Sequence, residues 1–165
     1  MRAVTTPALM PDLFIPEELY SAQAYLTTQT LEQIVERNLR EGDAVWPGIK
    51  AVVDFEWSST NALIIEGIDI TPSLVHTTYD STKCKAVFLV DEDGDRIREV
   101  VHTRGLWDDP HAYADDLKEK EVEWVRAYSA RIRLEAEKYG YPCLEVSKSA
   151  DDFAALLKTL DLKID

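Results

Sequence analysis

The chain has 165 residues, of which 45% are hydrophobic and 30% are charged. This length suits one domain with a hydrophobic core and is short for two. Acidic residues outnumber basic ones by 31 to 18, and the net charge of −13 argues against nucleic acid or an anionic membrane as a partner. No apolar run approaches the roughly 18 residues of a membrane span, and no signal-peptide pattern is present, so we expect a cytoplasmic protein.

The N-terminal third is predicted to be helical. A helical pattern starts at Pro16, where a proline followed by two glutamates suits a first turn. Apolar residues then recur at helical spacing from Leu19 to Leu39, and Gly42 ends the pattern. The stretch Ile49–Phe55 fits either a helix or a short strand.

Short continuous apolar runs predict strands in the rest of the chain. They cover residues 62–65, 86–90 and 143–146, and a helical turn follows Pro72. Hydrophobicity that is continuous rather than alternating is typical of strands covered on both faces, as in a parallel α/β sheet.

Two further helices alternate with these runs. An amphipathic stripe from Leu117 to Tyr139 predicts a long helix, which Gly140 stops with Pro142 just beyond. A last helix is predicted at about residues 150–160. The alternation of helices and strands indicates an α/β fold.

Glu66 directly follows the first apolar run and precedes Gly67. In open α/β sheets, ligands bind beyond the carboxyl ends of the strands, where an acidic side chain can reach a metal-bound nucleotide. A solvated turn residue is the structural alternative. We favour the functional interpretation because a carboxylate beside an apolar run is costly to bury unless it is paired.

Arginines gather between the second apolar run and the long helix. Arg96, Arg98 and Arg104 lie within nine positions of an otherwise acidic chain, and arginine suits phosphate because its planar fork donates two hydrogen bonds. The alternative is that they neutralise the neighbouring acidic turn at residues 91–95. His102, Asp108 and His111 match no metal-ligand spacing, so no metal site is predicted there.

Several of these features resemble a known family. The stretch from Ile64 to Ile68 (Ile-Ile-Glu-Gly-Ile), followed by Pro72, resembles the Ile-Ile-Glu-Gly-Val-His-Leu-x-Pro region of 2-phosphoglycerate kinase-like proteins, which are P-loop nucleotide kinases. The later elements follow the same order over about residues 1–160. The resemblance implies an α/β fold: a three-layer P-loop kinase-like parallel sheet with a helical acceptor lobe and a lid, whose first strand and P-loop are absent.

The resemblance also implies a domain plan and roles for side chains. It implies one domain with an acceptor-binding lobe (2–60), core strands (61–90), a lid and lid helix (91–139) and a final strand and helix (140–165). Glu66 would organise magnesium or the attacking hydroxyl, and Arg104 would close over the transferred phosphoryl group. Contacts to phosphate or nucleotide would come from Arg98, Arg126, Arg131, Lys148 and Ser149, and a contact to the substrate from Arg2.

The sequence departs from this family in one respect. Such kinases begin with a strand and a glycine-rich loop that holds the phosphates, and the sequence contains no G-x-x-x-x-G-K-[ST] motif. We therefore expect a fragment from which about 40 N-terminal residues are missing, an extent judged from typical element sizes. The missing strand would lie between the strands ending at Glu66 and Val90 and would leave two apolar edges.

Two hypotheses follow. The first is a fragment of an ATP-dependent kinase that phosphorylates a hydroxyl group of a small metabolite resembling 2-phosphoglycerate. ATP and magnesium would be the cofactors of the complete protein, and this chain would be nearly inactive and would bind neither tightly. The second is a non-catalytic interaction domain that keeps the kinase scaffold without a P-loop. Its acceptor-lobe helices or exposed sheet edges would bind a partner, and the edges could also support self-association.

Overall fold

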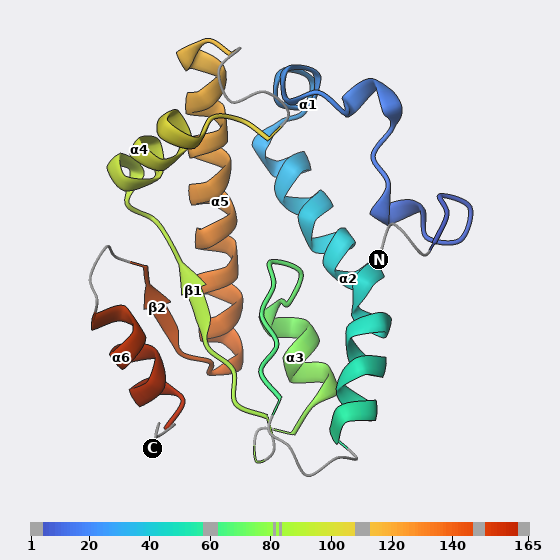
Figure 1. The fold of residues 1–165 in the computed structure, drawn as a ribbon, viewed down its shortest axis with the longest axis vertical. Coiled ribbons are helices and arrows are strands. Elements are labelled where there is room, and N and C mark those ends of the chain that lie inside the picture. Colours follow the sequence, from blue (N-terminus) through green and yellow to red (C-terminus); the bar gives the residue numbers. More distant parts are fainter. Residues whose placement is uncertain are drawn as a thin grey trace.

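The chain folds mainly into helices that pack along one long helix, α5 (Asp115–Tyr139) (Figure 1). The computed structural model describes residues 5–57, 63–80, 82, 84–107, 113–146 and 151–161. Within these ranges no helix is both long and apolar enough to cross a membrane. The other elements are, in chain order, η2 (Pro11–Leu13), η3 (Glu17–Leu19), α1 (Ala22–Thr28), α2 (Leu31–Trp57), α3 (Pro72–Thr78), β1 (Phe88–Val90), α4 (Gly94–Arg104), β2 (Cys143–Glu145) and α6 (Asp151–Thr159).

The predicted helix from Pro16 to Gly42 is broken into shorter elements. The break before α2 is a capping box: the Thr30 Oγ1 accepts the Gln33 N–H at 3.2 Å, and the Gln33 Oε1 accepts the Thr30 N–H at 2.8 Å. α2 then continues past Gly42 and through Pro47, so the ambiguous stretch 49–55 is helical.

Position 42, inside α2, needs a glycine because the backbone at Asp69 approaches the helix closely there. A Cβ atom at this position would lie 3.0 Å from the carbonyl oxygen of Asp69. A larger residue would push α2 away from the segment that leads into α3, since the neighbouring atom belongs to the backbone.

The end of α5 is confirmed as predicted. Gly140 adopts a left-handed conformation with φ of 75°. The Tyr141 N–H donates to the Ala136 carbonyl at 2.8 Å, and the Gly140 N–H donates to the Glu137 carbonyl at 3.2 Å, which together form a Schellman motif. The chain thereby turns directly from α5 into β2.

Two of the three predicted strands form, each with three residues. β1 and β2 pair in parallel with Leu89 opposite Leu144. The Phe88 N–H donates to the Pro142 carbonyl at 3.0 Å, and the Val146 N–H donates to the Val90 carbonyl at 2.9 Å. Phe88 and Val90 are buried, whereas Leu89 on the other face is 59% exposed. One face of the sheet is therefore open at β1.

The predicted three-layer parallel sheet is wrong. The described residues contain a two-stranded sheet in a largely helical fold. The first predicted strand, residues 62–65, does not form: residues 63–67 run as an elongated segment without regular secondary structure (Figure 1), and within the described part of the chain they pair with no strand. Ala62 lies outside the described residues. An apolar run forms a strand only where a neighbouring backbone completes the hydrogen bonds, and the apolar pattern does not reveal whether one is present.

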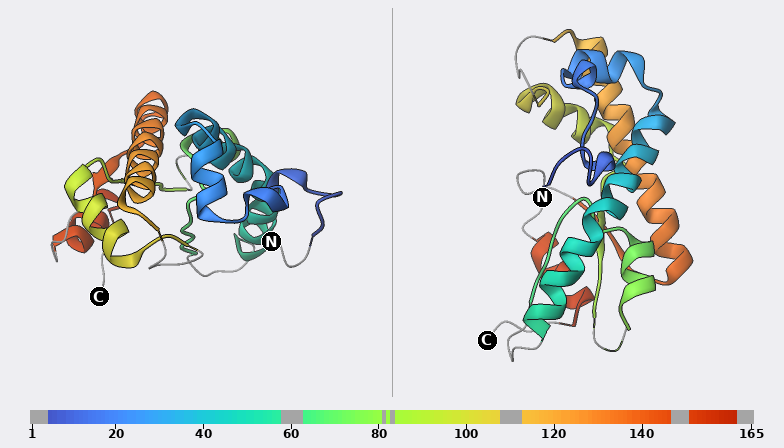
Figure 2. Two further views of the ribbon diagram at one scale, coloured as in Figure 1. Left: turned by 90° about the horizontal axis from the view of Figure 1, so that it is seen from above. Right: turned by 90° about the vertical axis from the view of Figure 1, so that its right-hand side faces the viewer.

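The buried side chains form two cores that share α5. The α1–α4 core consists of Ala22, Tyr25, Leu26, Ile34, Ile97, Val101, Leu106 and Val122. The sheet core consists of Trp46, Val75, Phe88, Val90, Ile132 and Ala136. Figure 2 shows how α5 runs from α1 at one end of the molecule to α3 at the other. Successive turns of one helix thus stabilise two separate apolar clusters.

Candidate functional site

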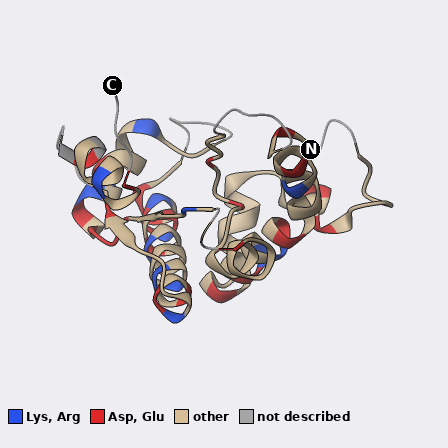
Figure 3. Ribbon diagram, turned by 90° about the horizontal axis from the view of Figure 1, so that it is seen from below, with Lys and Arg blue, Asp and Glu red and all other residues tan. Residues whose placement is uncertain are grey.

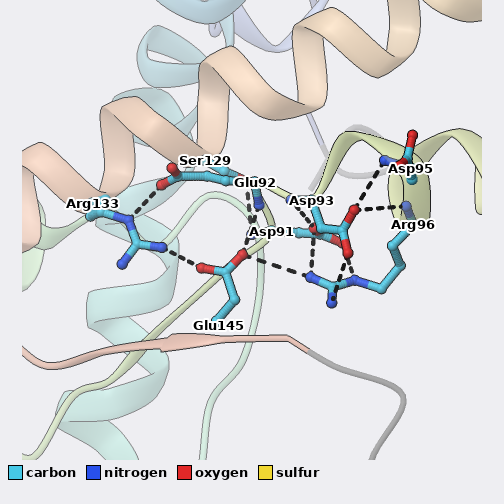
Figure 4. Close-up of polar contacts among 8 residues, drawn as sticks. All are labelled: Asp91, Glu92, Asp93, Asp95, Arg96, Ser129, Arg133 and Glu145. Atoms are coloured by element: carbon cyan, nitrogen blue, oxygen red, sulfur yellow. Dashed lines mark hydrogen bonds and ion pairs between the residues drawn. The ribbon is translucent and has the colours of Figure 1, made fainter.

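Charged side chains form a network at the carboxyl ends of β1 and β2 (Figure 4). Arg96 binds both oxygens of Asp91, with Nε to Oδ2 at 3.0 Å and Nη2 to Oδ1 at 2.7 Å. Arg133 on α5 donates to Glu92 and to Glu145, and the Glu92 N–H donates to Glu145 at 2.9 Å. Hydrogen bonds to these carboxylates raise the pKa of both arginines. The network therefore joins β1, β2, α4 and α5.

The acidic turn before α4 has a structural role in this network. Asp93 caps α4 by accepting the N–H groups of Asp95 at 3.0 Å and Arg96 at 3.1 Å. The Asp91 N–H donates to the Ser129 hydroxyl of α5 at 3.2 Å. The geometry matches the alternative considered for Arg96, because its guanidinium neutralises the turn beside it.

Arg98 lies on the exposed side of α4. It contacts Asp95 at 2.8 Å and Glu119 of α5 at 2.7 Å. The Nε2 atom of His102 lies 3.1 Å from the same Glu119 carboxylate. The hydrogen bond that Arg98 donates to Glu119 is the main cause of the lowered pKa of this carboxyl group. These contacts connect α4 to α5 on the surface.

Arg104 lies at the far end of α4 from the strands. The helix has 11 residues, so its ends lie roughly 15 Å apart at about 1.5 Å per residue. Arg104 pairs with Glu121, which is only 4% exposed. The Glu121 Oε2 is buried without a hydrogen-bond partner in the described part of the chain. Burial raises the pKa of Glu121 despite the opposing effect of Arg104.

The remaining predicted phosphate contacts lie apart from one another. Arg131 pairs with Glu36 of α2 at 3.1 Å and with Glu135 at 3.3 Å. The Arg126 side chain passes beside Gly94, whose Cβ would lie 3.5 Å from the Arg126 Cδ. Lys148, Ser149 and Arg2 lie outside the described residues. The basic residues of α5 alternate with acidic ones along the helix, as Figure 3 shows.

Glu66 is exposed within the extended segment 63–67. In the described parts of the chain it makes no hydrogen bond or ion pair, and Arg104 bonds to Gly105 and Glu121 instead. A phosphate site needs several cationic groups that converge on one point. Arg98, Arg104 and Arg131 each have a carboxylate partner instead. The described residues also contain no cluster of three or more His, Cys, Asp and Glu side chains able to hold a metal ion.

A second surface feature is apolar and lies on two of the apolar runs for which the sequence predicted open sheet edges. Large hydrophobic side chains are exposed along the extended segment and on β1; we call them the apolar edge surface, and they are Leu63 (45%), Ile64 (84%), Ile65 (37%), Ile68 (63%) and Leu89 (59%). The apolar runs that predicted strands were the available signal.

The extended segment is held at one end against α5 and α2. The Tyr128 hydroxyl of α5 donates to the Ile68 carbonyl at 2.9 Å, and the Ile70 N–H donates to the Gly67 carbonyl at 3.2 Å. Burial raises the pKa of Tyr128. Since β1 also contacts α5, one helix supports both parts of the apolar edge surface. In Figure 1 the extended segment and β1 run in the same direction.

β1 has one paired edge and one free edge. Phe88 and Val90 direct their backbone groups toward β2. Because N–H and C=O groups of successive residues in a strand point to opposite edges, those of Leu89 point away from β2. Among the described residues neither group has a backbone partner. This free edge, together with the exposed Leu89 side chain, can accept another extended chain.

Comparisons of the chain with protein-family models, with curated proteins and with solved structures find no match.

Proposed function

We propose that the chain is a non-catalytic interaction domain that accepts an extended segment of a partner protein along the free edge of β1. The observation that carries this proposal is the N–H and C=O pair of Leu89, which has no backbone partner among the described residues. The strand that bears it packs on the same helix, α5, as a segment of exposed aliphatic side chains. Peptides that add a strand to a sheet gain affinity from backbone hydrogen bonds and specificity from alternate side chains.

The grouping of exposed aliphatic side chains in one short segment supports this function. An isolated exposed leucine or isoleucine needs no explanation, but neighbouring ones favour an interaction surface. Ile64, Ile65 and Ile68 belong to one short segment, and Tyr128 fixes that segment to α5. The surface is therefore held in place before a partner arrives, which lowers the entropy lost on binding.

The phosphotransfer hypothesis stays a prediction. It would require Arg104 to leave Glu121, which would remain as a buried carboxylate without its cation. It would also require Arg98 to leave Glu119. Each separation costs free energy that phosphate binding would have to supply, so the geometry supports the interaction domain better.

The test is a backbone substitution at the free edge. Leu89→Pro removes the N–H that points away from β2 and leaves the bonds of Phe88 and Val90 to β2 intact, so the fold should tolerate it. We expect this substitution to abolish the binding of extended peptides rich in β-branched residues. Binding is measured by adding the peptide to the 15N-labelled protein and following its backbone amide signals by NMR. Leu89→Ala is the matched control, because it keeps the N–H and should weaken binding only partly.

Two outcomes would contradict the proposal. Unchanged peptide binding by the Leu89→Pro variant, with its circular dichroism intact, would show that the edge of β1 is not used. Micromolar binding of magnesium-ATP, lost in an Arg104→Ala variant, would favour the phosphotransfer hypothesis instead.

A further inference from the structure

We infer that the segment accepted at the apolar edge surface carries an arginine or lysine that pairs with Glu66, and that it comes from a different protein rather than from a second copy of this chain. The inference rests on the proposed function, because it specifies the chemistry of the partner at the same surface.

Glu66 is the charged residue inside the apolar edge surface. It lies between the exposed Ile65 and Ile68 and is itself exposed, and among the described residues it has no ion-pair or hydrogen-bond partner. A partner that covers these aliphatic side chains also removes water from the Glu66 carboxylate. That removal costs free energy unless a cation takes the place of the water.

The arginines nearest the carboxyl end of β1 are already committed to other carboxylates. Arg96 binds Asp91, and Arg133 binds Glu92 and Glu145 at the carboxyl end of β1. Hydrogen bonds to these carboxylates raise the pKa of both arginines. Since no cation among the described residues pairs with Glu66, we take the cation to come from the partner. Arginine suits the role best because its planar fork can bind both carboxylate oxygens.

A second copy of the chain would not provide this cation. Neither segment 63–68 nor β1 contains a lysine or an arginine. A symmetric dimer through this surface would bury Glu66 of each copy against aliphatic side chains or against another carboxylate. The net charge of −13 on each copy would add long-range repulsion. The same net charge would instead attract a basic partner.

The experiment compares two sets of synthetic peptides with the full 165-residue chain. The sets share one β-branched apolar sequence and differ in a single residue, either arginine or glutamine, which is moved through successive positions. Binding is followed by fluorescence anisotropy and by the Leu89 amide signal. The chain variants are Glu66→Gln and, as a matched control on an exposed face of α2, Glu32→Gln.

We expect the best arginine peptide to bind about tenfold more tightly than its glutamine counterpart. This advantage should disappear in Glu66→Gln, persist in Glu32→Gln and shrink as salt is added. Equal binding of the two peptides, or an advantage that survives Glu66→Gln, would overturn the inference while leaving the proposed function standing. A concentration-dependent dimer that Ile64→Lys abolishes would also overturn it. If neither peptide moves the Leu89 amide signal, the proposed function itself fails.

Discussion

The two cores of this protein differ in how completely they are enclosed. In the α1–α4 core, Leu26 and Ile34 are fully buried, and the rings of Tyr25 and Trp124 meet at a tilt with their centroids 6.4 Å apart. In the sheet core, side chains of the same helix α5 pack against only one face of β1. Leu89, on the other face, remains exposed to water.

This difference indicates where the molecule interacts with others. Both cores are supported by one helix, so the open surface of β1 does not result from a shortage of packing partners along α5. Charged groups pair within the chain at the α4–α5 contact, as in Arg104 and Glu121, and also at the carboxyl ends of β1 and β2. Glu66 on the apolar edge surface has no such partner in the described residues.

The largest expected effect tests the closed core. Leu26→Ala removes a side chain with no solvent exposure, and the cavity should lower the free energy of unfolding by about 3 kcal/mol. Urea denaturation followed by tryptophan fluorescence would measure it. A loss below about 1 kcal/mol would mean that this core is loosely packed and that the contrast between the two regions is smaller than proposed.

The second test concerns the ion pair between α4 and α5. Arg104→Ala should lower the free energy of unfolding by about 2 kcal/mol, because it leaves the buried Glu121 carboxylate without its cation. Adding Glu121→Gln should recover most of the loss, and thermal or urea unfolding of the three variants completes the cycle. If Arg104→Ala left the free energy of unfolding unchanged, Arg104 would not be needed for stability and could instead serve in binding.

A smaller effect should depend on pH. Burial raises the pKa of Glu121 above its ordinary value of 4.5, so the folded state favours the protonated carboxyl. The stability contributed by this group is complete below pH 4.5 and is lost as the pH rises through the raised pKa. Glu121→Gln mimics the protonated form and should stabilise the protein by about 1 kcal/mol at pH 7. The difference between the variant and the natural chain should vanish at pH 4; an equal difference at both pH values would contradict the assignment.

The smallest expected effect belongs to the open region. Leu89→Ala removes a side chain that is 59% exposed and should change the free energy of unfolding by less than about 0.5 kcal/mol. The Leu26→Ala variant serves as the matched comparison under the same urea titration. A loss at Leu89 approaching that at Leu26 would mean that another part of the chain covers β1 in solution.

The sequence predicted the elements whose signals are local. The amphipathic stripe and Gly140 located the end of α5, and the apolar runs located β1 and β2. The break between α1 and α2 was missed although Thr30 and Gln33 have the spacing of a capping box. That signal was present in the sequence and was outweighed by the continuous helical periodicity across it.

What could not be predicted depends on contacts between distant residues. The pairing of Arg104 with Glu121 spans 17 positions and follows from the packing of α4 on α5. In contrast, the contact of Arg98 with Asp95 has the spacing of helical neighbours and could have been anticipated. The strand predicted at residues 62–65 does not form at 63–65, because no neighbouring strand completes its hydrogen bonds within the described part of the chain. An apolar run does not reveal whether such a neighbour is present.

The hydrogen bond from Tyr128 to the Ile68 carbonyl allows the position of the extended segment to be followed by the ultraviolet absorbance of this tyrosine. A phenol that is buried in this way resists ionisation, so the absorbance of Tyr128 in alkali would stay unchanged while the extended segment remains seated on α5. Any partner that lifts the segment would hydrate the phenol and let it ionise earlier. Detachment of the segment could then be timed without a label.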